Sequence, residues 1–153
     1  MSAANLPLDR DAMRLLAEIG FVGTLSGPVG ATTTLFQSLQ LLRPDSILPL
    51  IGLALNDLAA KRPEDAVRIL RDEALKQHPG DAEAMAFLGL ALQKAGQNAE
   101  AHKVLMNVLQ NRSADALPHV RMAMKLLQTN GGPVPEIAPV ARPQWSDQLR
   151  ATR

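Results

Sequence analysis

A self-similarity at a spacing of 35 residues runs through this 153-residue chain. Two sets of residues recur at that interval: Ala31, Ala66 and Ala101 and, four positions further on, Leu35, Leu70 and Leu105. A period of about 20–50 residues indicates a repeat array, in which each unit buries its apolar face against its neighbours. Because a helical stretch precedes each alanine, the sequence predicts stacked pairs of helices.

Each upstream stretch carries an apolar residue followed by glycine, at Gly20, Gly52 and Gly89. This order, followed by Ala-x-x-x-apolar, is the tetratricopeptide pattern with aliphatic side chains in place of its aromatic ones. The last copy matches best, with Met85, Leu88, Gly89, Leu92, Gly96, Ala101 and Leu105. Two helices that cross closely need a small residue at the crossing, which offsets the cost of about 1 kcal/mol for glycine in a helix.

The copies differ in the distance from this glycine to the alanine. The distances are 11 residues for Gly20 to Ala31, 14 for Gly52 to Ala66 and 12 for Gly89 to Ala101. We assign the two additional residues of the middle copy to a longer turn, and we treat the first copy as a degenerate repeat. Three helix pairs are expected.

Breakers and caps predict helices near residues 9–23, 30–42, 46–60, 63–77, 81–95, 98–111 and 115–128. Asp9 and Asp81 suit N-caps, Pro63 suits a first turn, and Gly80 and Gly96 suit helix ends. The last helix would cover the open end of the stack. We therefore predict an all-α fold of three tetratricopeptide-like helix pairs plus a C-terminal capping helix, a right-handed solenoid over residues 1–129.

Residues 130–153 form a second region of different composition. Four prolines spaced through it predict a Pro-rich flexible tail without a core of its own. It contains Trp145, the only tryptophan of the chain. Trp145 is either a loosely packed tail residue or a short anchor that docks on a partner or on the protein's own groove, because tryptophan is enriched at binding hot spots.

Composition argues against several classes of function. A net charge of +1 argues against nucleic-acid binding through phosphate contacts, and an aromatic content of 3% argues against binding through base stacking. The absence of cysteine excludes disulfides and thiolate chemistry. The N-terminus lacks the order of a signal peptide, and the longest apolar stretch, Ile47 to Leu55, is too short to cross a bilayer. We expect a cytoplasmic protein with no membrane insertion.

The sequence offers little for catalysis. His78, His102 and His119 lie at spacings that suit no zinc motif, and no serine lies in a nucleophile-elbow context. The glycine-containing stretch 27–33 has no lysine for a phosphate loop. We therefore expect no enzyme, no cofactor and no metal.

A binding surface remains, and the tetratricopeptide pattern suggests its place. In such arrays the first helix of each pair lines the concave face, and the residue after its glycine points into the groove. Those residues are Phe21, Leu53 and Leu90, with Asn56, Gln93 and Lys94 expected at the rim. The helix at 46–60 is more apolar than one buried stripe requires, so it either contributes to an apolar groove or is buried all round between its neighbours.

The stretch from Ala17 to Leu109 resembles the tetratricopeptide chaperones of bacterial type III secretion systems, nearest the needle-subunit branch. Three phrases carry the resemblance: Leu42-Arg43-Pro44-Asp45, Arg62-Pro63-Glu64-Asp65-Ala66-Val67 and Leu88-Gly89-Leu90-Ala91-Leu92. The Pro-rich tail and the longer second turn depart from that family and leave the identity of the partner open.

The resemblance implies a bacterial cytoplasmic chaperone. Its concave groove would hold the amphipathic C-terminal helix of a secreted needle-type subunit and prevent premature polymerisation, with a small helical co-chaperone as a second partner. An unliganded apolar groove would also allow a homodimer. The alternatives are a generic scaffold joining two proteins, a chaperone of a translocator or export-apparatus component, and an enzyme or regulator with a site at the tail and groove.

Overall fold

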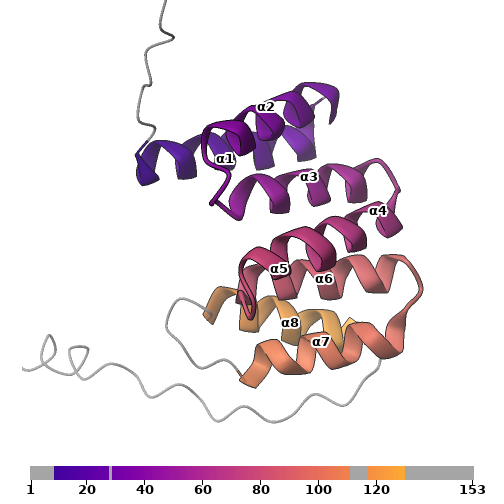
Figure 1. The fold of residues 1–153 in the computed structure, drawn as a ribbon. Coiled ribbons are helices and arrows are strands. Elements are labelled where there is room, and N and C mark those ends of the chain that lie inside the picture. The colour runs from indigo at the N-terminus through magenta and orange to yellow at the C-terminus, as the bar shows by residue number, and fades with distance from the viewer. Residues whose placement is uncertain (1–8, 28, 111–116, 130–153) are drawn as a thin grey trace, which may run out of the picture.

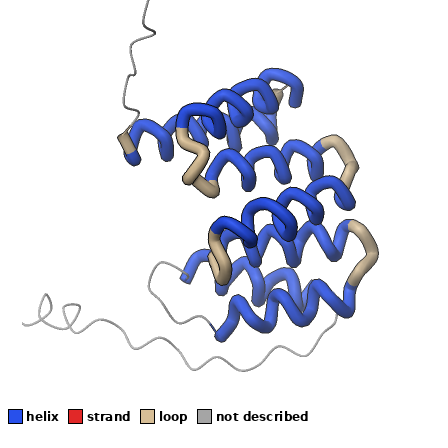
Figure 2. Tube along the Cα trace, viewed as in Figure 1, coloured by secondary structure: helices blue, strands red, loops and turns tan. Residues whose placement is uncertain are grey.

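The structure, a computed structural model, describes residues 9–27, 29–110 and 117–129. The described part is helical and contains no strand (Figure 2). Its elements are α1 (Arg10–Ser26), α2 (Val29–Leu42), α3 (Leu48–Ala59), α4 (Pro63–Arg68), η1 (Ile69–Ala74), α5 (Leu75–Gln77), α6 (Ala82–Lys94), α7 (Asn98–Gln110) and α8 (Leu117–Thr129). The predicted helix at 63–77 is continuous, with π-type hydrogen bonding over its middle part, η1. Each predicted helix is present within two or three residues of its expected ends.

From α1 and α2 to α7 the helices stack in chain order along one direction, and α8 lies beside α6 and α7 (Figure 1). α1 and α2 pack together and α3 lies against both, α4 and η1 lie between α3 and α6, and α8 packs on α6 and α7. The architecture is the predicted all-α solenoid of stacked helices.

Three apolar clusters follow one another along this stack. The first joins α1 and α2 around Phe36, and the second joins α3, α4, η1 and α6 around Ile51 and Leu70. The third joins α6, α7 and α8 around Leu105 and Leu127. α8 therefore buries its apolar face on the preceding pair, and its prediction as a capping helix is confirmed.

Local capping signals explain where the helices begin and end. The Asp9 carboxylate accepts a hydrogen bond from the Ala12 amide at 2.7 Å, and Asp81 accepts one from Ala84 at 2.8 Å. Each side chain thereby satisfies a free N–H group of the first turn, as predicted. Gly96 has a φ of +77°, a backbone conformation that glycine adopts without strain.

The three glycines of the repeat pattern lie at close helix crossings. A Cβ atom on Gly20 or on Gly52 would overlap the ring of Phe36, and one on Gly89 would overlap Leu105. Phe36 thus fills the space left by two glycines, one on α1 and one on α3. Small residues at the crossings let large ones interdigitate, which is the packing role predicted from the sequence.

The second turn is not longer, which corrects the sequence prediction. Residues 60–62 connect α3 to α4, and residues 95–97 connect α6 to α7, so both turns have three residues. The two additional residues lie within α3, after Gly52. When the helices are matched from the turn, Ala54 on α3 corresponds to Gly89 on α6, and both are buried. The 35-residue register therefore pairs Leu90 with Leu55 rather than with Leu53.

None of the helices in the described ranges is long and apolar enough to span a bilayer.

Candidate binding site

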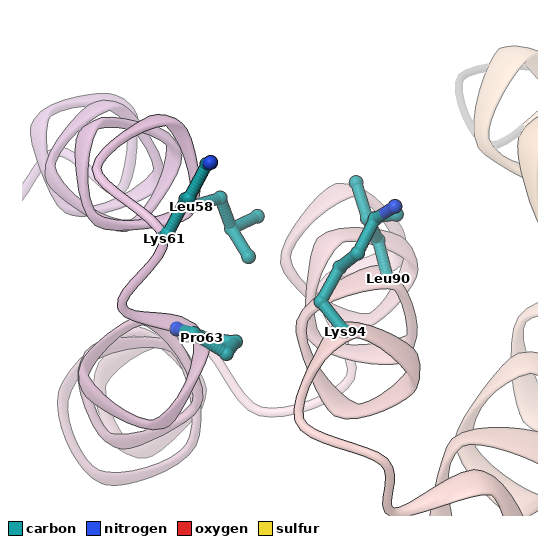
Figure 3. Close-up of a pocket in the computed structure, with 5 residues that line it drawn as sticks. All are labelled: Leu58, Lys61, Pro63, Leu90 and Lys94. Carbon is teal, nitrogen blue, oxygen red and sulfur yellow. The ribbon is translucent and has the colours of Figure 1, made fainter.

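An open pocket of about 380 Å³ lies where the end of α3, the start of α4 and the outer face of α6 meet (Figure 3). Its lining comprises Leu58, Lys61, Pro63, Leu90 and Lys94. Leu58 belongs to the last turn of α3, Lys61 to the following turn and Pro63 to the first position of α4, whereas Leu90 and Lys94 lie on α6. Each side of the pocket therefore contributes one leucine and one lysine.

The apolar part of this pocket comes from leucines at the edge of the core. Leu58 packs against the central cluster but remains partly exposed, and Leu90 is partly exposed as well. On α6, residues Leu88, Ala91 and Leu92 face the core. Leu90 and Lys94 share a different face because they are four residues apart on the helix. The fold thus leaves two aliphatic side chains partly exposed at the pocket.

Lys61 has an unusual backbone conformation, with a φ of +60°. It is the only non-glycine residue with a positive φ among those the structure describes. The left-handed region costs an ordinary residue about 1 kcal/mol or more relative to glycine. Gly96 holds the corresponding position in the next turn, 35 residues further on, and has a φ of +77°. At the one turn that borders the pocket, a lysine therefore replaces the residue that the backbone favours.

Of the site residues predicted from the sequence, Leu90 and Lys94 meet in this pocket. Leu53 does not reach it, since its side chain packs against the cluster formed by α1 and α2. The Phe21 ring lies against Phe36, with 5.4 Å between ring centroids. Of Phe21, Leu53 and Leu90, only Leu90 lines the pocket, and the register of α3 is shifted by two residues relative to α6.

The helix that includes Leu53 is enclosed by its neighbours. From Leu48 to Leu58, every residue of α3 is buried or partly buried. The helix contacts α1, α2, α4, η1 and α6. Burial between neighbours, one of the two explanations for the apolar composition of 46–60, therefore accounts for most of it. The Leu58 end of the helix borders the pocket.

Asn56 requires a correction, because its side chain lies inside the protein rather than at a rim. The residue is 2% exposed. Its Oδ1 lies 2.5 Å from Thr24 Oγ1 and 3.0 Å from Thr32 Oγ1, and its Nδ2 donates to Thr33 Oγ1 at 3.1 Å. Asn56 thus ties α3 to both α1 and α2, and its burial keeps the amide out of reach of a guest. The sequence signal that could have predicted this buried role is the single asparagine in the otherwise largely apolar helix α3.

Gln93 is also engaged within the fold. Its Nε2 donates to the Leu126 carbonyl at 3.0 Å and ties α6 to α8. Of the three predicted rim residues, only Lys94 borders the pocket. Leu58, Lys61 and Pro63 were missed as site residues, although the 35-residue register places Lys61 at the position of Gly96 and could have identified it. Trp145, the predicted anchor, lies outside the described residues.

A second apolar surface lies on the outer face of α1. Four large aliphatic side chains on this face each have more than half of their surface exposed: Leu15, Ile19, Val22 and Leu25.

Within the described ranges, no group of three histidine or acidic side chains could hold a metal ion.

A family model described as tetratricopeptide repeat matches residues 57–127. The matched segment runs from the end of α3 into α8 and contains all five residues of the pocket. No curated protein matches the chain. The match supports a tetratricopeptide-type protein, and repeats of this type generally mediate protein–protein interactions and serve as scaffolds rather than catalysts.

Proposed function

We propose that this chain is a chaperone of a bacterial type III secretion system. In this proposal it binds an amphipathic helix of a secreted needle-type subunit in the cytoplasm before export. The observation that carries the proposal is the pocket between α3 and α6, where Leu58 and Leu90 are partly exposed in a protein that has a tetratricopeptide repeat. The resemblance of residues 17–109 to the needle-subunit branch supports the choice of guest.

The binding mode would be helix in groove. Amphipathic helices dock by placing residues at i, i+3, i+4 and i+7 on an apolar surface. A pocket of about 380 Å³ falls within the usual range for binding sites and has room for an aliphatic anchor on Leu58 and Leu90. The chaperone would act stoichiometrically. Covering the helix through which a subunit polymerises would keep that subunit soluble and competent for export.

The outer face of α1 is where we place the small helical co-chaperone that the resemblance implies. Four aliphatic side chains on one exposed helix face form an apolar surface that monomeric proteins usually cover. Without such a partner, the same surface would favour a homodimer. This contact would be separate from the guest site, because α1 lies at one end of the stack and the pocket lies at α3, α4 and α6 (Figure 1).

Two alternatives keep the same site but change the guest. A chaperone of a translocator or of an export-apparatus component would bind a different helix in the same pocket. A generic scaffold would instead bind a peptide of a folded partner. An enzyme or regulator built from the tail and the groove gains no support from the pocket, whose lining has two lysines but no acid, histidine, serine or cysteine beside them.

Co-expression tests this proposal. The full chain, carrying an affinity tag, is produced with each secreted needle-type, translocator and export component of the same genome, and complexes are analysed by mass spectrometry and light scattering. We expect a stoichiometric complex with a needle-type subunit. Leu90→Asp should abolish it, whereas Leu41→Asp, a change at a side chain that is 85% exposed on α2, should not.

Recovery of a translocator or an export component would change the branch of the family but retain the chaperone class. A complex that survives Leu90→Asp would contradict the site. If none of these subunits co-purifies with the protein, the chaperone function is contradicted and the generic scaffold is favoured.

A further inference from the structure

We infer that the pocket selects an acidic amphipathic segment of a protein partner, with a guest carboxylate held between Lys61 and Lys94 and a guest aliphatic side chain on Leu58 and Leu90. The inference rests on the proposed function in one respect, since it concerns the same pocket. It specifies the chemistry of the guest, which neither the repeat family nor the resemblance supplies.

The arrangement of the side chains supports this chemistry. Figure 3 shows Leu58 and Lys61 on the α3 side of the pocket and Leu90 and Lys94 on the α6 side. Each side of the pocket therefore contributes both an apolar side chain and a positive charge. A guest that bridged α3 and α6 would meet a leucine and an ammonium group on each.

The charge of the two lysines is not neutralised by the described residues around them. Neither of them forms an ion pair in the part of the chain that the structure describes. The nearby acids are paired elsewhere: Asp57 with Arg62, and Asp65 with Arg62 and Arg68. Glu64 lies in the first turn of α4, where a carboxylate is favoured by the helix dipole, and it pairs with neither lysine. The positive charge at the pocket thus remains available to a guest.

The backbone of Lys61 is a second, independent argument. Its φ of +60° is strained for a lysine, and glycine occupies the same position in the next turn. Residues held in such conformations concentrate at binding and catalytic sites. An ammonium group placed at the edge of the pocket is the property that lysine has and glycine lacks, so a binding role explains the strained residue.

A carboxylate on a helix fits this site better than a phosphate group. A helix presents residues i and i+4 on one face, so an acidic and an aliphatic side chain can reach the lysines and the leucines together. Nucleic acid would require a wider basic surface, and the net charge of the chain is only +1. Leu58, Pro63 and Leu90 make up most of the lining, and a phosphate would leave these apolar side chains uncovered.

The test uses two synthetic peptides and the full chain. Both are 18-residue helical peptides with leucines at i, i+3, i+4 and i+7; one has glutamates beside the leucines and the other has glutamines at those positions. Affinity is measured by fluorescence anisotropy at low and high salt. We expect the glutamate peptide to bind roughly ten-fold more tightly at low salt, with a difference that shrinks as salt screens the charges.

Three lysine variants locate the effect. Lys61→Gly and Lys94→Gln should each weaken binding of the glutamate peptide roughly two- to five-fold and leave the glutamine peptide unchanged. Lys103→Gln, an exposed lysine on α7, removes the same charge away from the pocket and should have no effect. Lys61→Gly also relieves the strained backbone, so its thermal midpoint should not fall, and loss of binding cannot be attributed to unfolding.

The outcomes separate the charge selectivity from the pocket itself. Equal binding of both peptides, or no effect of Lys61→Gly and Lys94→Gln while Leu90→Asp abolishes binding, would refute the selectivity and retain the pocket. Unchanged binding in Leu90→Asp would refute the pocket and with it the site of the proposed function. No binding of the glutamate peptide up to millimolar concentration, or tighter binding of an oligonucleotide of equal charge, would also overturn the inference.

Discussion

Replacing Asn56 with alanine should destabilise the protein by about 2–3 kcal/mol. The change removes three polar contacts, from the Asn56 amide to Thr24, Thr32 and Thr33. Together they are worth about 2–3 kcal/mol, because the single hydroxyl protons of Thr24 and Thr32 are each shared between Asn56 Oδ1 and a backbone carbonyl. Each threonine hydroxyl also lies within 3.0 Å of a backbone carbonyl in its own helix, so none is left without an acceptor. The better helix propensity of alanine returns about 0.5 kcal/mol, and the small space left by the amide costs a similar amount.

Urea unfolding followed by circular dichroism measures this change. Asn107→Ala is the matched control, because Asn107 is an exposed residue on α7 and forms no hydrogen bond among the described residues. We expect the control to be neutral or slightly stabilising, and the effect of Asn56→Ala to be large relative to a typical stability of about 5–15 kcal/mol. Hydrogen exchange should show the lost protection mainly in α1 and α2, which Asn56 ties to α3. A loss below about 1 kcal/mol would refute the structural role and return Asn56 to the list of residues available to a guest.

Three further changes test the fold and its strained turn. Lys61→Gly should raise stability by up to about 1 kcal/mol in thermal unfolding, since glycine adopts a positive φ freely; a lower midpoint would contradict the strain at that residue. Gly89→Ala should destabilise by about 1–2 kcal/mol because its Cβ would overlap Leu105, whereas Gly30→Ala, which meets no neighbouring atom, should not; equal effects would show that the crossing can relax. Leu53→Asp should lower the unfolding midpoint by placing a charge against the cluster of α1 and α2, and a folded variant that loses only guest binding would restore Leu53 to the groove.

The helices could be predicted because their limits depend on local signals. Asp9 and Asp81 satisfy amides within their own first turns, and the φ of Gly96 is set by the turn that contains it. These interactions span only a few residues and can be recognised in the sequence. The capping helix α8 was predictable for a similar reason, since its apolar residues recur at helical spacing beyond the last repeat.

The binding residues could not be placed as well, because their positions depend on the register between helices. Gly52 suggested one alignment of the α3 sequence with the α6 sequence. The turns that follow the two helices have the same length and require another alignment, in which Ala54 is equivalent to Gly89. A shift of two residues turns a helical side chain to a different face. Leu53 therefore faces the first cluster, and Leu58 rather than Leu53 borders the pocket.

The two ends of the stack differ in a way that bears on function. At one end α8 buries Val120, Ala123 and Leu127 against the last helix pair. At the other end α1 exposes four aliphatic side chains on its outer face, Leu25 to 86%. Repeat arrays need a polar outer surface on their terminal units, and α1 lacks one over this face. Among the described residues, the outer face of α1 and the pocket at α3, α4 and α6 are separate apolar surfaces, so a guest at the pocket would leave the face of α1 free for a second partner.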